Sequence, residues 1–231
     1  ARRIRQTGAG ARRYPPEVTR SDPADGTRAA LQTTPDIPSS SAPRVALFGG
    51  SFNPPHMAHV LVAVWALATD EVDEVWIIPT GGHPFGKSLE AFDHRLAMCR
   101  LAFGFSSRVR VTDVEREPRV HYTVETLRRL CALYPNHRWR WLMGSDTVAK
   151  TPNWRQFDEI EKLAPPLTIP RDGHGHGAGP NGAFALPDLS STMIREHLVS
   201  GGAPGELDGL VPGAVLRYIE AHGLYRPGAT G

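Results

Sequence analysis

The chain has 231 residues, of which 26 are Lys or Arg and 24 are Asp or Glu, so its formal net charge at pH 7 is +2. This length suits one α/β domain with a full core, with or without a tail. Residues 1–42 contain seven Arg and four acidic residues, which leaves a net charge of −1 for the rest of the chain. A nearly neutral body lacks the basic surface of a nucleic-acid-binding protein, and the longest apolar run, residues 60–68, is too short to span a bilayer. We therefore expect small-molecule partners, without nucleic acid or membrane; the oligomeric state is left open.

Residues 1–42 are rich in Arg, Pro, Ser and Thr and show little apolar periodicity, which predicts a disordered tail. One folded domain is expected over residues 43–231, and the tail is expected to be dispensable for activity. The two cysteines, Cys99 and Cys131, lie in helix-like apolar patterns, as buried thiols do in a reducing compartment. We therefore expect a cytoplasmic protein.

From residue 44 onward, apolar runs of strand length alternate with segments of helical periodicity. The predicted strands are residues 45–48, 74–79, 109–114, 139–143, 167–170 and 183–186. The predicted helices are residues 56–69, 93–103, 123–134, 154–163, 192–199 and 212–222, with Asp93 as the N-cap of the second. This alternation predicts an α/β fold with a doubly wound, mostly parallel Rossmann-like sheet that is covered by helices on both faces.

The first predicted strand runs into the segment Gly49-Gly50-Ser51-Phe52-Asn53-Pro54-Pro55-His56-Met57-Ala58-His59. Paired glycines allow a tight turn and a close approach to a ligand, and the helix that follows offers unpaired N–H groups to an anion. His56 and His59 are three residues apart, so in a first helical turn they face the same side and can donate to one phosphate group. The alternative is an ordinary strand–turn–helix connection with solvated histidines, and the combination of features favours the phosphate site.

A second segment, Ser190-Ser191-Thr192-Met193-Ile194-Arg195, places hydroxyl groups at a helix start and a guanidinium one turn further on. These groups can converge on an anion, although Ser and Thr are also ordinary helix caps. Lys87 follows the second strand and can reach a triphosphate, and a solvated lysine is nearly as good an interpretation. Trp154 offers a flat face to an aromatic ring, with core packing as its alternative. All these segments follow the carboxyl ends of predicted strands, as one shared site requires.

Residues 49–59 and 189–195 resemble the (T/H)-x-G-H and (I/L)-S-S-T-x-x-R signatures of a nucleotidyltransferase superfamily. The likeness is greatest to the bacterial nicotinate-nucleotide adenylyltransferases, and it covers roughly residues 43–227. It includes His121-Tyr122-Thr123 and the Gly144-Ser145-Asp146…Trp154 spacing. Three positions depart from the family pattern: Ala58 replaces a usual glycine, His121 replaces a usual serine, and the order of residues 83–87 is altered.

The resemblance implies that the protein transfers AMP from ATP, accompanied by Mg²⁺, to nicotinate mononucleotide. It implies a nucleotidyltransferase domain over residues 43–231 and the following site residues. The implied catalytic residues are His56, His59 and Arg195. The residues implied to bind ATP and its phosphates are Gly49, Gly50, Ser51, Phe52, Lys87, Ser190, Ser191 and Thr192. Those implied to bind the mononucleotide are Tyr122, Thr123, Asp146 and Trp154. In this assignment Trp154 stacks on the pyridine ring, Tyr122 and Thr123 border it, and Asp146 binds a ribose or orders the site.

Several alternatives stay open from the sequence alone. The acceptor can instead be nicotinamide mononucleotide or phosphopantetheine, and a protein of another class would be a nucleotide-binding sensor without turnover. His174 and His176 suggest a metal clip, but two histidines among flexible glycines are weak evidence. We therefore predict no protein-held metal.

Overall fold

Five parallel strands form one sheet in the computed structural model, which describes residues 42–69, 71–82, 89–117, 122–148, 151, 154–169 and 186–226. The strands are β1 (Arg44–Gly50), β2 (Glu74–Pro79), β3 (Val109–Val111), β4 (Arg138–Gly144) and β5 (Pro166–Ile169). Their order is β3-β2-β1-β4-β5, and every neighbouring pair is parallel. The chain therefore reverses its direction of winding between β1 and β4, which is where ligands bind in folds of this type. The predicted Rossmann-like fold class is confirmed.

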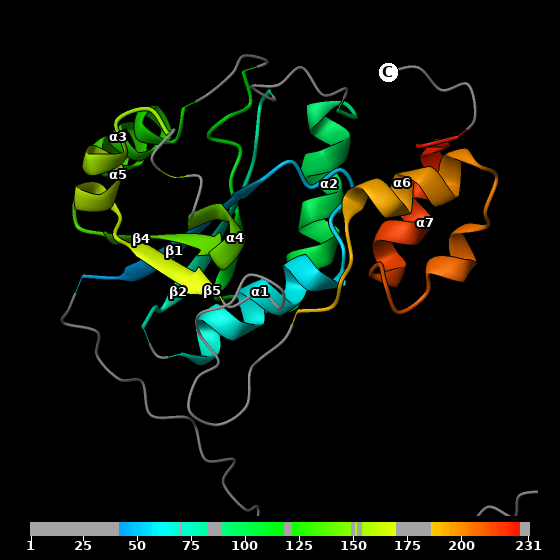
Figure 1. Cartoon of the computed structure of the whole chain (residues 1–231), viewed down its shortest axis with the longest axis horizontal. Coiled ribbons are helices and arrows are strands. Elements are labelled where there is room, and N and C mark those ends of the chain that lie inside the picture. Colours follow the sequence, from blue (N-terminus) through cyan, green and yellow to red (C-terminus); the bar gives the residue numbers. More distant parts are fainter. Residues whose placement is uncertain are drawn as a thin grey trace, which may run out of the picture. The chain divides into compact units, whose positions relative to one another are not determined.

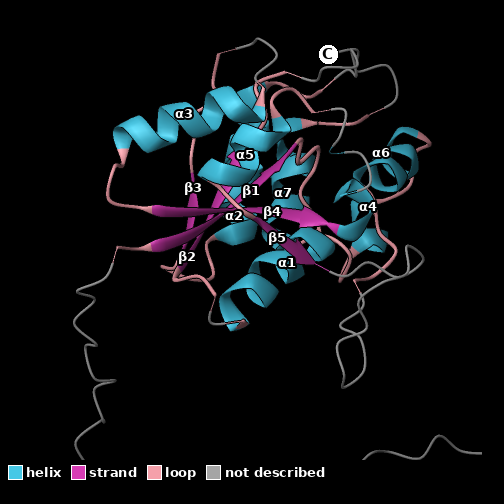
Figure 2. Cartoon of the chain, turned by 60° about the vertical axis from the view of Figure 1, so that its left-hand side comes forward, coloured by secondary structure: helices cyan, strands magenta, loops and turns pink. Residues whose placement is uncertain are grey.

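Helices cover both faces of the sheet (Figures 1 and 2). On one face, a first core contains side chains of α1 (Met57–Ala68), α2 (Phe92–Phe103), α6 (Ser191–Val199) and α7 (Gly213–His222). On the other face, a second core contains side chains of α3 (Thr123–Leu133) and α5 (Phe157–Leu163). The short helix α4 (Ser145–Val148) directly follows β4, and a 3₁₀ turn, η2 (Pro204–Leu207), precedes α7.

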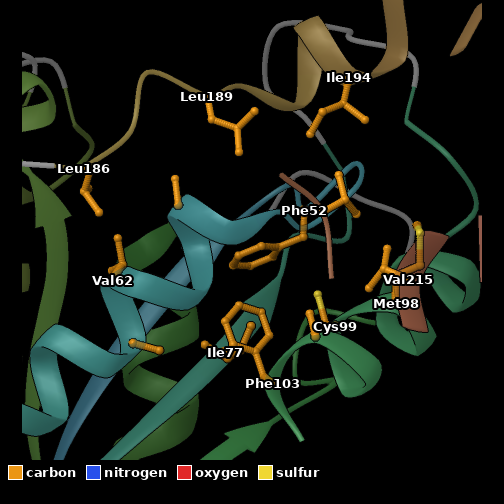
Figure 3. Close-up of a cluster of buried hydrophobic side chains, with 14 of the residues drawn as sticks. Phe52, Val62, Ile77, Met98, Cys99, Phe103, Leu186, Leu189, Ile194 and Val215 are labelled. Atoms are coloured by element: carbon orange, nitrogen blue, oxygen red, sulfur yellow. The ribbon is translucent and has the colours of Figure 1, made fainter. Parts of the chain in front are cut away.

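Alternation along the strands divides the buried side chains between the two cores. In β1, Ala46 belongs to the first core, whereas Val45 and Leu47 belong to the second. In the first core, the Phe52 ring points toward Phe103 and Ile77, as Figure 3 shows. Burial of both faces explains why these strands read as continuous apolar runs in the sequence.

Some predicted boundaries are wrong for identifiable reasons. Asp93 is not an N-cap, because α2 begins at Phe92 and Asp93 instead forms an ion pair with Arg116. The helix predicted from Trp154 begins only at Phe157, because Gln156 has a left-handed backbone with φ 55°. The predicted strand at 183–186 falls outside the described residues except for Leu186, which is not in a strand.

Both cysteines are free thiols, and Cys99 is fully buried whereas Cys131 is half-buried. Desolvation by burial raises the pKa of both thiols above the usual value, so they remain protonated at neutral pH. No helix in the described part of the chain is long and apolar enough to cross a membrane.

The second core supplies a test of the packing. Leu127 on α3 is fully buried, and its replacement by Ala is expected to lower the free energy of unfolding by about 2–5 kcal/mol. Leu133 on the same helix is 59% exposed, so Leu133→Ala is the matched control, with an expected change within about 0.5 kcal/mol. Urea denaturation measures both, and equal costs for the two variants would contradict the packing of α3 on the sheet.

Candidate active site

The loop after β1 takes its shape from Phe52 rather than from the glycines. Gly49 and Gly50 are still part of the strand, whereas Phe52 has a φ of 45° and is fully buried. A Cβ at Gly49 would lie 3.1 Å from Cζ2 of Trp141, and a Cβ at Gly50 would lie 3.2 Å from the Phe52 ring. The expectation that the glycines themselves form the turn is therefore wrong. Aromatic rings pack directly against their backbone, so a larger residue at either position would require a ring to shift.

Asn53 is the centre of a buried hydrogen-bond network behind this loop. Its side chain is 2% exposed, and its Oδ1 atom accepts hydrogen bonds from the Tyr225 hydroxyl at 2.7 Å and the Glu90 backbone N–H at 3.2 Å. Its backbone oxygen accepts a hydrogen bond of 2.7 Å from Nη1 of Arg195. Burial raises the pKa of Tyr225, so its hydroxyl keeps the proton that it donates. The loop is thus joined to α6 and to the segment after α7.

A buried arginine supports the same loop from α2. Arg95 is 1% exposed; its Nη1 donates to the backbone oxygen of Ser51 at 3.0 Å, and its Nε donates to that of Glu90 at 2.8 Å. Burial lowers its pKa from the usual value, yet a guanidinium stays charged at neutral pH. Sequence reasoning missed Arg95, Tyr225 and the central role of Asn53. A charged residue on the apolar side of a predicted helix was the signal available for Arg95.

The two histidines lie together at the start of α1, as their spacing predicts. Their ring centroids are 3.7 Å apart and the rings are tilted by 30°. The backbone N–H of His56 donates to Nδ1 of His59 at 3.2 Å. Because Nδ1 of His59 accepts this bond, the neutral ring carries its proton on Nε2, the atom with which it can donate to an anion. His56 is 2% exposed, whereas His59 lines a cavity.

This cavity lies at the carboxyl ends of β1 and β4, where the strand order reverses, and has a volume of about 230 Å³. Its walls come from β1, α1, β4, α4, β5 and the segments before α5 and α6. The lining residues are Phe48, Gly49, Ala58, His59, Val62, Trp141, Leu142, Met143, Gly144, Thr147, Trp154, Ile169 and Leu186. The Ala58 side chain, at the position that departs from the family pattern, is therefore part of the wall.

The start of α6 contacts the loop directly. Ser191 Oγ donates to the backbone oxygen of Pro54 at 2.8 Å, two residues before His56. Ser190 is the N-cap and accepts from the Met193 N–H at 3.2 Å, so the capping interpretation holds for this residue. Thr192 is exposed, and its Oγ1 accepts from Nη2 of Arg195 at 3.4 Å. The structure therefore brings the predicted Ser-Ser-Thr turn, its arginine and the two histidines to one place.

The remaining predicted site residues are less closely gathered. Trp154 is half-buried and lines the cavity. Tyr122 precedes α3 and is 43% exposed, with the Arg155 guanidinium 4.8 Å from its ring centroid, and Thr123 is the first residue of α3. Two predictions cannot be placed: the Asp146 side chain and Lys87 both lie outside the described residues.

A parallel sheet whose loop at the switch point is bonded to a second helix start and its arginine has the architecture of an α/β nucleotide-binding protein. The cytidylyltransferase-like family profile matches residues 47–197. A probable nicotinate-nucleotide adenylyltransferase of Anaeromyxobacter sp. strain K is 46% identical over 191 residues, which cover 81% of this chain and 99% of the relative. A protein of the same name from Myxococcus xanthus is 42% identical, with 80% and 95% covered. The chain belongs to the nicotinate-nucleotide adenylyltransferase family.

Solved structures agree with this fold. The Plasmodium falciparum nicotinic acid mononucleotide adenylyltransferase complexed with NaAD superposes with a TM-score of 0.67 at 22% identity, covering 79% of this chain and 97% of that chain. At this identity the likeness supports the Rossmann-like nucleotidyltransferase fold.

The buried network generates a prediction for Tyr225→Phe. The variant keeps the ring but removes the donor to Asn53, so the loop loses a fixed contact, and we expect kcat to fall about 10-fold. Tyr218→Phe is the control, because the Tyr218 hydroxyl bonds Nδ1 of His94 between α7 and α2, away from the loop. Activity is compared at a temperature where both variants are fully folded. Equal kcat values in the two variants would show that the Asn53 network does not position the loop.

Proposed function

We propose that the protein transfers AMP from ATP to nicotinate mononucleotide, forming nicotinate adenine dinucleotide and pyrophosphate in NAD biosynthesis. The observation that carries this proposal is the direct contact of α6 with the loop that precedes the histidines. This contact brings Ser191 and Arg195 against the loop that leads to His59, and His59 lines the cavity. The names of the relatives and the NaAD complex of the Plasmodium protein support the pyridine mononucleotide as acceptor.

The chemistry requires positioning and charge stabilisation rather than a covalent nucleophile. The attacking group is the phosphate of the mononucleotide, which is already an anion at neutral pH. The protein has to hold two polyanions in line and stabilise the charge that develops on the bridging and leaving oxygens. In this proposal Nε2–H of His59 donates to the α-phosphate, and His56 assists at the β- and γ-phosphates. Arg195 and the N-termini of α1 and α6 add positive potential.

Mg²⁺ is proposed to enter as part of the ATP complex. Within the described ranges, no cluster of three or more His, Cys, Asp or Glu side chains is arranged to hold a metal. Phosphate oxygens are good ligands for Mg²⁺, so the triphosphate itself supplies the ligands that the described protein side chains do not. The ion would reduce the repulsion between the two anionic substrates.

The mononucleotide is proposed to lie against Trp154, with Tyr122 and Thr123 at its border and Asp146 near its ribose. Trp154 supports this placement because it lines the cavity together with His59. We also propose that residues 43–231 form the nucleotidyltransferase domain and that the protein works in the cytoplasm, where its two free thiols would stay reduced.

Pyrophosphate release from ATP, measured with each acceptor in turn, tests the proposed function. Nicotinate mononucleotide is expected to give the highest kcat/KM, with the dinucleotide identified by its mass. Faster turnover with nicotinamide mononucleotide or phosphopantetheine would replace the proposed acceptor. Binding of ATP without turnover with any of the three acceptors would indicate a sensor.

His59→Ala tests the proposed mechanism. Removing a donor that binds more strongly in the transition state than in the ground state is expected to lower kcat by roughly 10²-fold, with a smaller change in KM. His222→Ala is the matched control, because His222 is exposed on α7 and its Nδ1 contacts the Tyr218 backbone oxygen. A His59→Ala enzyme with near-normal kcat would eliminate the assigned role.

A further inference from the structure

Trp141, on β4, lies next to both Gly49 and Trp154, two lining residues of the cavity that come from different segments of the chain. Its side chain is 7% exposed, and it lines the cavity between Gly49 and Trp154. Gly49 begins the segment that leads to the phosphate-binding histidines, and Trp154 is the proposed platform for the pyridine ring. No motif in the sequence assigns Trp141 a role in the site.

Next to the proposed phosphate-binding segment, the Trp141 ring limits the size of the residue at position 49 of β1. A Cβ built on Gly49 would lie 3.1 Å from Cζ2 and 3.2 Å from Cη2 of Trp141. Contacts of this length require the indole to move, and the indole is enclosed by the second core. The six-membered ring of Trp141 therefore restricts position 49 of β1 to a residue without a Cβ unless the indole moves.

On the side of the mononucleotide, Trp141 meets Trp154 edge to face. The ring centroids are 6.4 Å apart and the planes are at 83°. Phe157 meets Trp154 in the same way from α5, at 6.3 Å and 88°. Trp154 precedes α5 and is not part of the helix, so these two aromatic contacts, rather than helical backbone, constrain the direction of its face.

We propose that Trp141 is a positioning residue for the mononucleotide, which orients Trp154 and keeps it in register with the end of β1 at Gly49. This inference rests on the proposed function, because it takes the pyridine ring to stack on Trp154. The ligand is an aromatic mononucleotide whose ring and phosphate must be held at a fixed separation. Trp141 acts on the mononucleotide indirectly, through Trp154 at the ring and through the segment that begins at Gly49 at the phosphate.

Trp139 shows that this arrangement is not a general property of tryptophans on β4. It lies two residues earlier on the same face of the sheet and is 5% exposed. Its neighbours are the Trp76 ring at 5.2 Å and the His137 ring at 5.2 Å, toward the amino end of the sheet. Trp139 does not line the cavity, so Trp139→Phe makes the same chemical change away from it.

Steady-state kinetics of Trp141→Phe and Trp139→Phe test the proposal. In Trp141→Phe we expect KM for nicotinate mononucleotide to rise about 3- to 10-fold while KM for ATP changes less than about 2-fold. Trp139→Phe should leave both constants unchanged. A merely structural role would reduce the folded fraction, and with it the apparent kcat, without separating the two KM values. Equal behaviour of the two variants would overturn the proposal.

Gly49→Ala, made in the wild-type and Trp141→Phe backgrounds, tests the second contact. Alone, the added methyl group should displace Trp141 and lower both kcat and the melting temperature. Phe at position 141 removes the atoms that collide, so the double variant should recover part of both losses, which is strong non-additivity. If the effects of the two substitutions on kcat and on the melting temperature are additive, the inferred contact between position 49 and Trp141 is wrong. If the wild type lacks activity with nicotinate mononucleotide, the proposed function fails, and the melting temperatures still report on this contact.

Discussion

The site depends on the hydrogen bonds that hold the loop after β1 in place through its backbone oxygens. The oxygens of Ser51, Asn53 and Pro54 accept hydrogen bonds from Arg95, Arg195 and Ser191, which come from two helices far apart in the sequence. These donors hold the loop from the protein side before any ligand binds. A loop that is fixed in advance can present its groups to developing charge without reorganising during the reaction. The Asn53 side chain adds Tyr225 to the same network, so the end of the described chain also contributes.

The sheet topology explains how segments from both faces of the sheet meet at one cavity. Because β1 lies between β2 and β4, the loops after β1 and β4 diverge to opposite faces of the sheet. The loop after β1 leads to the histidines of α1, and the chain after β4 leads through α4 to Trp154. Trp141 is placed where these two paths separate. Pairing of β1 with β4 holds the starts of the two paths together, and the Trp141 ring packs beside Gly49 on one path and Trp154 on the other.

Much of this architecture could be predicted from local patterns. Apolar runs located all five strands of the described sheet, and the segment after the first strand placed His59 at the cavity at its carboxyl edge. Ser191 was expected to follow a strand at 183–186, whereas in the described residues it is located by its hydrogen bond to the Pro54 backbone oxygen. The turns were harder to predict, because Phe52 and Gln156 adopt a left-handed backbone conformation that a sequence usually indicates with glycine. The longer-range contacts were out of reach. The Tyr225–Asn53 bond joins residues 172 positions apart, and nothing in either local sequence indicates the partner.

A crystal structure of the protein with bound nicotinate adenine dinucleotide would test the central claim most directly. The account predicts that the bridging phosphates lie within hydrogen-bond distance of Nε2 of His59 and close to the start of α6. It also predicts that the pyridine ring stacks on Trp154, with the Ser51–Pro54 loop unchanged. Phosphates bound away from that loop, or a loop rearranged around them, would contradict it.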